Sequence, residues 1–337
     1  MKDYKNILVD VRGGTGKNIA FLSIAKELKE KYEHVSVISP YTDLAQACDY
    51  VDRAYNPQEV RAALEDAGDD TFIVIDHIYD TDAFIRKEIS YQDAFRIMCG
   101  LEPKDEPTGG TSAVSELNPE RAFPQLRQMA DGILNDIKNK GYKDFIMFQG
   151  TGSQSPLVHV PTGIRKDENG NDVQFPDWSK VPYNGQNMGL SRHYPKELAD
   201  EFISEFQKEH PETAVINYNL PNEYHFNGVF QYTVPYMVYY LLSKADNCVG
   251  IVAIDSSLQH LVAGMCKAVV MWHHSLPDSF GYRYNKNLIA NCKRDGIKYF
   301  SALGPASNRI DYIKPQTLLK EVDEYLYGVT ENESKAD

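Results

Sequence analysis

The sequence is poor in cysteine, and the few cysteines it has follow no binding pattern. Its five cysteines are odd in number and widely spaced, and none forms a C-x-x-C pair. Structural zinc sites need closely spaced ligands, and disulfide-rich secreted domains need paired cysteines, so neither class is indicated. We therefore expect reduced thiols, no metal site and a cytoplasmic protein.

Long apolar runs are also missing. The longest candidate, residues 229–242, is interrupted by Gln231, Thr233 and Pro235, and a membrane-spanning helix needs about 20 apolar residues. The first residues are charged and then strand-like, which differs from a signal peptide. The sequence therefore predicts no stable membrane insertion.

Cationic residues are outnumbered. Lys and Arg total 35 against 48 Asp and Glu, so the formal net charge of the 337-residue chain is −13. Nucleic-acid binding relies on clustered cations, so this balance argues against a protein wholly dedicated to nucleic acid. A local basic patch on an acidic protein is still compatible with it. The length suits two domains of about 100–200 residues each.

What the sequence does contain is a regular alternation of short apolar runs and helical patterns. Strands are predicted at residues 7–11, 35–39, 72–76, 144–148, 214–218, 248–254 and 268–272. This alternation is typical of parallel sheets with helices on both faces. We predict an α/β fold with an N-terminal domain over residues 1–142, a C-terminal domain over 143–315, a closing helix over 316–328 and a disordered tail over 329–337.

An insertion interrupts the second half at about residues 155–190. It contains Asn169-Gly170, which is a strong signal for a hairpin turn. We expect an irregular segment or a hairpin there.

The segment over residues 250–272 carries the most chemistry. Its apolar strand ends in Asp255, and Ser256, Ser257 and a short helix with His260 follow. Ligands of parallel α/β sheets bind at the carboxyl ends of strands, and a helix N-terminus offers N–H groups to a phosphate. We expect one serine to cap this helix and His260 to reach the same anion. The alternative is an ordinary helix cap and a packed histidine.

Glycine-rich turns follow two of the predicted strands. The turn over residues 12–17 is not a nucleotide-binding P-loop, since Val11 and Asn18 stand where that motif needs Gly and Ser or Thr. The second turn is Gly150-Thr151-Gly152. Glycine lets a ligand approach the backbone closely, although each turn could also be tight without a ligand.

Two charged residues outside these turns are further candidates. Arg192 precedes a predicted helix and could neutralise a phosphate, although a lone arginine is commonly solvated. Asp76 ends the strand at residues 72–76 and is a candidate general base, or else a loop aspartate that caps the next segment.

Together these segments resemble glycosyltransferase family 9, the heptosyltransferase-like enzymes. Residues 245–282 resemble the family's C-terminal signature, in which a strand ends in Asp-Ser/Thr-Gly and a histidine follows in a short helix. The segments ILVDVRGGTGK, FIVID, FIMFQGTGS and SRHYPKELADEF resemble other family segments in the same order. The resemblance implies a GT-B fold, with two Rossmann-like domains that face a cleft.

The resemblance also implies a metal-independent, inverting glycosyltransferase without a cofactor. Its donor would be a nucleotide-diphosphate sugar, and its acceptor a surface glycan or a lipid-linked sugar. The donor-binding residues would be Gly150, Thr151, Gly152, Arg192, Asp255, Ser256, Ser257 and His260. The acceptor-side residues would be Gly13, Gly14, Thr15 and Lys17.

The chain departs from the family at the expected base. The family has Gly-Asp in the first turn, whereas this chain has Gly16-Lys17, and Ser257 replaces a glycine. We therefore assign the catalytic role of base to Asp76, with Asp10 second, and assign His260 to the leaving group.

Two alternatives stay open. One is transfer to a hydroxylated base in DNA, for which a basic cleft would be needed from Arg12, Lys17, Arg86, Lys87 and Arg165. The other is a catalytically silent nucleotide-sugar binding protein, suggested by the lost Gly-Asp. The sequence leaves the nucleotide, the sugar, the acceptor and the oligomeric state open.

Overall fold

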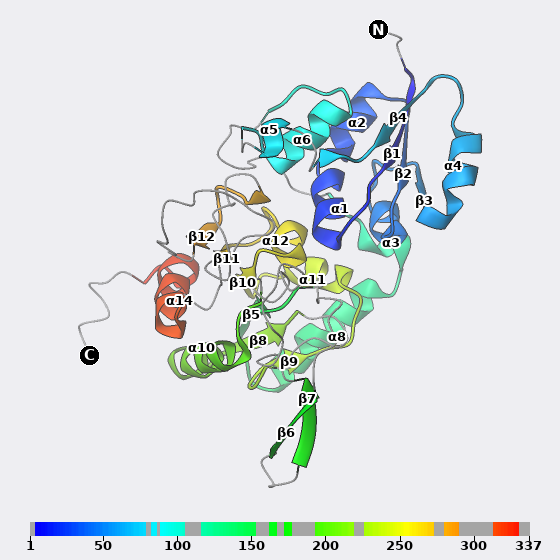
Figure 1. Ribbon diagram of the computed structural model, residues 1–337. Helices are drawn as coiled ribbons and strands as arrows, with labels where there is room; N and C mark the ends of the chain where they lie inside the picture. The colour runs from blue at the N-terminus through cyan, green and yellow to red at the C-terminus, as the bar shows by residue number, and fades with distance from the viewer. Residues whose placement is uncertain are drawn as a thin grey trace.

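The computed structural model describes residues 4–78, 82–85, 88–104, 116–152, 162–166, 172–176, 193–218, 226–272, 280–289 and 313–329. Within these residues the chain forms two parallel sheets with helices on their faces and a separate two-stranded hairpin (Figure 1). The predicted α/β class, with two Rossmann-like halves, is confirmed.

The described part of the N-terminal half contains a four-stranded parallel sheet in the order β3-β2-β1-β4. Its strands are β1 (Asn6–Asp10), β2 (His34–Ile38), β3 (Arg53–Tyr55) and β4 (Thr71–Ile75). Its helices are α1 (Thr15–Leu22), α2 (Ala25–Lys31), α3 (Thr42–Gln46), α4 (Val60–Asp66), α5 (Asp82–Ile85) and α6 (Tyr91–Met98). β1 is apolar throughout its centre because Leu8 packs on one face with α4, while Ile7 and Val9 pack on the other with α1 and α2.

One stretch of helical apolar spacing in the sequence is divided between two helices. The helical pattern from Ile19 to Leu28 belongs to α1 and α2, which are separated at Ser23 and Ile24. The Ser23 hydroxyl donates to the carbonyl of Ala20 at 2.6 Å. Such local bonding by serine competes with the regular helical hydrogen bonds, which accounts for the break.

The described part of the C-terminal half contains a six-stranded parallel sheet in the order β12-β11-β10-β5-β8-β9. Its strands are β5 (Asp144–Gln149), β8 (Thr213–Asn217), β9 (Phe230–Gln231), β10 (Cys248–Ile254), β11 (Ala268–Trp272) and β12 (Lys286–Ile289). The helices that follow the first sheet are α7 (Pro119–Ala122), α8 (Leu126–Asn139), α10 (Lys196–Glu209), α11 (Met237–Leu242), α12 (Ser257–Leu261) and α14 (Pro315–Val322). α8 and α11 cover one face of this sheet, and α10 and α14 cover the other (Figure 1).

The predicted insertion contains a hairpin. β6 (Thr162–Lys166) pairs antiparallel with β7 (Asp172–Pro176), with Lys166 opposite Asp172. The hairpin projects from the C-terminal half (Figure 1). The Asn169-Gly170 turn lies outside the described residues.

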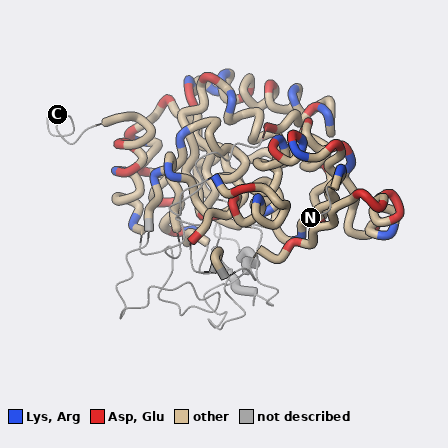
Figure 2. Tube along the Cα trace, turned by 90° about the horizontal axis from the view of Figure 1, so that it is seen from above, with Lys and Arg blue, Asp and Glu red and all other residues tan. Residues whose placement is uncertain are grey.

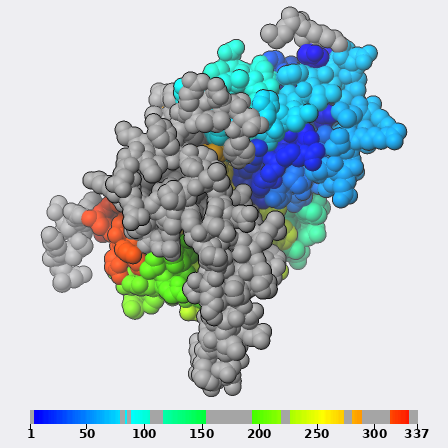
Figure 3. Space-filling view, in the orientation of Figure 1, coloured from blue at the N-terminus to red at the C-terminus, as the bar shows by residue number. Residues whose placement is uncertain are grey.

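The two halves share one hydrophobic core. A single cluster of buried side chains runs from Val9 in β1 to Met147 in β5 and Trp272 in β11. Polar contacts join the halves too, since the Tyr236 hydroxyl donates to Asp43 Oδ1 at 3.0 Å. Figure 3 shows the blue and cyan surface of the N-terminal half and the green and red surface of the C-terminal half toward opposite ends of the molecule.

Among the helices that the structure describes, none has the length and apolar character needed to cross a bilayer. The four described cysteines, Cys48, Cys99, Cys248 and Cys266, carry free thiols. α14 continues into a π-helical turn over Asp323–Tyr327, and residues 330–337 of the predicted tail lie outside the described residues.

Candidate functional site

The carboxyl ends of β1 and β4 place two aspartates side by side. Asp10 ends β1, Asp76 follows β4, and the Asp76 N–H donates to the Asp10 carbonyl at 3.0 Å. The glycine turn then leads from β1 into α1, with Gly14 at the N-cap position and Thr15 buried. Parallel strands present their carboxyl ends at one edge, so both carboxylates lie where α/β sheets bind ligands.

The acceptor-side turn and the donor-side helix are in contact. A Cβ atom added to Gly16 would lie 2.9 Å from His260 Cδ2 and 3.5 Å from Ser257 Cα. α1 therefore packs directly on α12, across the boundary between the two halves (Figure 1). The structure thus brings together the two segments that the sequence predicted on opposite sides of the site.

The two aspartates are engaged by cations. Asp76 is fully buried and forms an ion pair with Lys17, whose side chain is 9% exposed. Asp10 accepts a hydrogen bond from Arg12 Nη2 at 2.7 Å, and this bond raises the pKa of the Arg12 guanidinium. Asp10 is the more accessible carboxylate, with 15% of its side chain exposed. A carboxylate that holds a cation is a weaker general base, and this applies to both aspartates, but the Asp76 side chain is in addition closed to solvent.

On the donor side, Asp255 directly follows β10. Its N–H donates to the Met271 carbonyl at 3.0 Å, and its Oδ1 accepts from Gln259 Nε2 at 2.7 Å. Asp255 thus holds the first turn of α12 through Gln259 and helps to position this helix.

The cap of α12 differs from the prediction. Ser256 occupies the N-cap position, but its side chain makes no capping hydrogen bond. Gln149 reaches across from the end of β5 instead, and its Oε1 accepts from the Leu258 N–H at 3.1 Å while its Nε2 donates to Ser256 Oγ at 3.3 Å. Because α12 has only five residues, its dipole is small, so local donors must carry any anion binding here.

The glycine turn after β5 is tightly packed. A Cβ atom on Gly150 would lie 2.7 Å from Phe226 Cζ, so this glycine makes room for an aromatic ring. A Cβ atom on Gly152 would lie 3.2 Å from Ser256 Oγ, which places Gly152 beside the serines, and Thr151 between them is buried. Arg192 lies outside the described residues.

Ser257 and His260 each contact a tyrosine. Ser257 Oγ lies 3.0 Å from the hydroxyl of Tyr218. His260 is 5% exposed, and its Nδ1 lies 2.9 Å from the hydroxyl of Tyr282. Gln92 of the N-terminal half donates to that same hydroxyl at 3.4 Å.

Four of these residues were not among the site residues predicted from the sequence. Gln149 and Tyr218 had a usable signal, because Gln149 is the first polar residue at the carboxyl end of an apolar strand and Tyr218 follows Asn217 at the end of another. Gln92 had none, since it stands neither next to a predicted strand end nor in a motif, and Tyr282 lies at the end of the signature-like segment 245–282 but was not singled out within it.

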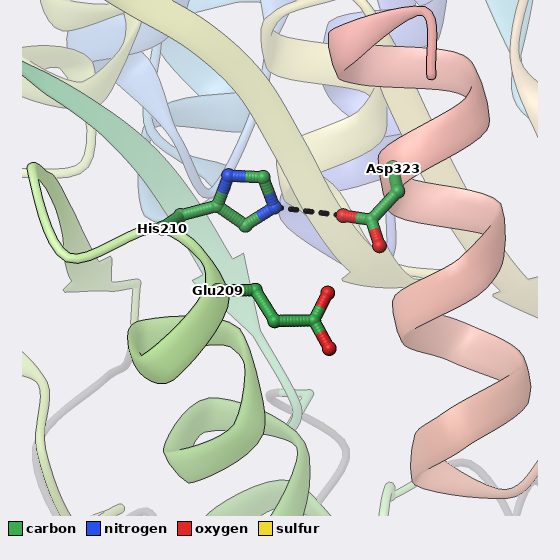
Figure 4. Close-up of side chains that lie close together, drawn as sticks. All are labelled: Glu209, His210 and Asp323. Atoms are coloured by element: carbon green, nitrogen blue, oxygen red, sulfur yellow. Dashed lines mark hydrogen bonds and ion pairs between the residues drawn. The ribbon is translucent and has the colours of Figure 1, made fainter. Parts of the chain in front are cut away.

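A separate polar cluster lies at the opposite edge of the C-terminal sheet. Glu209 and His210 end α10 just before β8 begins, and His210 Nε2 lies 2.7 Å from Asp323 Oδ1 (Figure 4). Among the described residues, these three form a group of side chains of the kind that bind metals, and their potential ligand atoms lie within 4.8 Å of one another. Because α12 begins at the carboxyl edge of the sheet, this cluster is not part of the candidate site.

Structural comparison gives long matches at low sequence identity. A glycosyl transferase family 9 protein from Veillonella parvula matches with a TM-score of 0.66 and 12% identity over 98% of this chain and 99% of its own. ADP-heptose LPS heptosyltransferase II from E. coli matches with 0.56 and 12% over 96% and 99%. The iron-containing dodecameric glycosyltransferase TibC from enterotoxigenic E. coli matches with 0.57 and 11% over 98% and 80%.

By sequence, no family model and no curated protein matches the chain. The structural matches cover almost the whole chain and include both halves. The chain therefore has the GT-B fold of the family 9 glycosyltransferase structures, as its resemblance to that family predicts.

Proposed function

We propose that this protein is a glycosyltransferase that moves a sugar from a nucleotide-diphosphate sugar to an acceptor hydroxyl. The observation that carries the proposal is the contact of Gly16 with Ser257 and His260, which joins the carboxyl edges of the two sheets at one place. The fold likeness supports it, since one neighbour is named as an ADP-heptose heptosyltransferase. A donor of the ADP-heptose type is therefore the first to test.

On the donor side, the hydroxyls of Ser256 and Ser257, the backbone beside Gly152 and the imidazole of His260 would hold the diphosphate. The diphosphate gains negative charge as the glycosidic bond breaks, and fixed N–H and O–H donors stabilise that charge. This arrangement needs no metal ion, and an inverting displacement by the acceptor hydroxyl is the simplest reaction for it.

For the base, the geometry supports Asp10 over Asp76. Both carboxylates hold a cation, Asp10 the guanidinium of Arg12 and Asp76 the ammonium of Lys17, but the Asp10 side chain is 15% exposed and that of Asp76 is 0% exposed. Asp10 lies beside the turn of Gly13, Gly14 and Thr15 that we assign to the acceptor, so its carboxylate would take the proton of the attacking hydroxyl.

The acceptor that we propose is a glycan or a lipid-linked sugar. A DNA acceptor gains no support, because Arg12 and Lys17 are engaged by Asp10 and Asp76. Arg86, Lys87 and the side chain of Arg165 lie outside what the structure describes. Over the rest of the described chain, basic and acidic residues are interspersed (Figure 2).

The test is a melting-temperature screen over ADP-, UDP- and GDP-sugars, followed by measurement of nucleotide diphosphate release with pooled acceptors. A donor that binds only the folded protein raises its melting temperature. We expect a shift with a nucleotide sugar that Ser257→Ala and His260→Ala reduce. Ser204→Ala, at an exposed position of α10, is the matched serine control.

The outcomes separate the alternatives. Donor binding with release of nucleotide diphosphate supports the enzyme. Binding without release from any acceptor pool would leave the silent binding protein, and a shift that survives both site variants would place the donor elsewhere.

A further inference from the structure

A buried chain of hydrogen bonds crosses from the N-terminal half to His260. Gln92 of α6 is 0% exposed, and its Nε2 donates to the hydroxyl of Tyr282 at 3.4 Å. Tyr282 is 1% exposed, and its hydroxyl lies 2.9 Å from His260 Nδ1. The three side chains therefore form a relay that ends on an imidazole at the candidate site.

The relay has a direction. An amide nitrogen can only donate, so the Tyr282 oxygen accepts from Gln92 and its own proton points to His260. Nδ1 then offers its lone pair to that proton, and the neutral imidazole carries its hydrogen on Nε2. A Cβ atom added to Gly16 would lie 3.5 Å from Nε2, so this nitrogen lies on the side of the glycine turn.

The ring and the backbone of Tyr282 are held in place by several neighbours. The ring stacks on Tyr284 with centroids 5.4 Å apart and meets His260 edge-on at 5.6 Å. The Tyr282 carbonyl accepts from Asn287 Nδ2 at 3.1 Å, and Asn287 Oδ1 accepts from Trp272 Nε1 at 2.8 Å. A residue fixed in this way suits the orientation of a neighbour better than direct contact with a substrate.

We propose that Tyr282 is a positioning residue for His260, and that Gln92 sets the direction of the relay so that His260 holds its hydrogen on Nε2. An Nε2–H group at the junction of the halves is a donor to an anion there, and this part of the inference rests on the proposed function. The choice of tautomer does not rest on it. The wrong tautomer would turn a lone pair toward a diphosphate.

The experiment reads the tautomer directly in the full-length protein with ¹⁵N-labelled histidine, by two-bond ¹H–¹⁵N correlation of the imidazole. Gln92→Glu places an acceptor where the amide donates, so the Tyr282 proton should turn to the carboxylate and His260 should move its hydrogen to Nδ1. Gln92→Leu removes the donor that fixes the direction, so the Tyr282 proton is no longer directed to His260 and both tautomers should be populated. Tyr282→Phe keeps the ring and removes the fixed proton, and should yield a mixture.

The same variants are assayed for transfer with the donor found above. We expect kcat to fall roughly 10–100-fold in Tyr282→Phe and Gln92→Glu, the range seen when a metal-binding histidine loses the partner that orients it in the same way. A near-ultraviolet circular dichroism spectrum checks that each variant is folded. If the Gln92→Glu variant does not fold, the two other single variants, Gln92→Leu and Tyr282→Phe, provide the test.

The outcomes are distinct. An Nδ1–H form in the unmodified protein, or a tautomer that none of the variants changes, would overturn the proposal. If the tautomer responds as expected but no nucleotide sugar is turned over, the positioning role stands and the proposed function fails.

Discussion

Gly16 has no room for a side chain, because α1 and α12 pack on each other at its Cα atom. In Gly16→Ala the new methyl group would press on His260 Cδ2, and overpacking of this kind costs roughly 1–3 kcal/mol. We expect lower stability in chemical denaturation together with a loss of transferase activity, since His260 must move.

Gly14→Ala is the matched control for this glycine. A Cβ atom there would meet nothing within 4 Å, and Gly14 has a φ of −76°, which alanine adopts without strain. Equal denaturation midpoints for the two variants would show that the α1–α12 contact is looser than described.

At the residue scale, the sequence could locate strand-end residues but not their partners. Asp76 was predicted to end the strand at residues 72–76, whereas Asp10 falls inside the strand predicted at residues 7–11. That Lys17 neutralises Asp76 depends on how α1 lies over the sheet, which no local pattern reports. The same holds for Gln149, which caps α12 from a neighbouring strand.

At the scale of elements, β10 depends on Gly250. The register with β5 shifts between Cys248 and Gly250, and Gly250 has a φ of +158°. A Cβ atom there would lie 2.6 Å from the backbone oxygen of Lys267 and 2.9 Å from Leu326 Cδ2. Gly250→Ala should therefore lower the free energy of unfolding by roughly 1–3 kcal/mol, measured as the urea midpoint.

Gly132→Ala provides the contrasting control on another element. Gly132 is exposed within α8, and a Cβ atom there would meet nothing within 4 Å. Alanine in a helix interior is favoured over glycine by roughly 0.5–1 kcal/mol, so this variant should be more stable. Shifts of the same sign in both variants would contradict the packing described for β10.

Elements were predictable where the apolar run was long. The buried strands β1, β5, β10 and β11 read as continuous apolar segments, because both faces of these strands are covered. The short strands β3, β9 and β12 were missed, since two to four residues carry no periodicity. The break between α1 and α2 was missed because the apolar spacing continues through it.

At the scale of the whole molecule, the C-terminal π-helical turn contacts the end of α10, and this contact depends on pH. His210 stacks on Tyr327 with centroids 4.0 Å apart and bonds Asp323, and Glu209 lies beside this pair (Figure 4). Burial, and after it the nearby Asp323, raises the pKa of Glu209. A raised carboxyl pKa means that the contribution of Glu209 to stability is present at low pH and is lost as pH rises through the folded-state pKa.

Glu209→Gln should therefore raise the melting temperature at pH 7.5, where the native glutamate is ionised and repelled by Asp323. Because Glu209 is largely exposed, the gain should be only a few tenths of a kcal/mol. The difference from the native protein should shrink toward pH 4. Glu30→Gln, at an exposed position of α2, controls for the loss of one carboxylate, and a gain independent of pH would contradict the assignment.

At this scale the sequence predicted two α/β halves but not how they meet. Strand alternation is a local pattern, whereas the packing of α1 on α12 joins residues far apart in the chain. The hairpin of β6 and β7 was anticipated because its turn residues are themselves local.

The continuous core has a consequence for how this protein unfolds. Val9, Met147 and Trp272 belong to one buried cluster, so separation of the two halves would expose apolar side chains of both. The two sheets are separate in topology but are expected to melt in a single cooperative transition. A chain cut near residue 143 would leave two fragments, each with an uncovered apolar surface, rather than two self-sufficient domains.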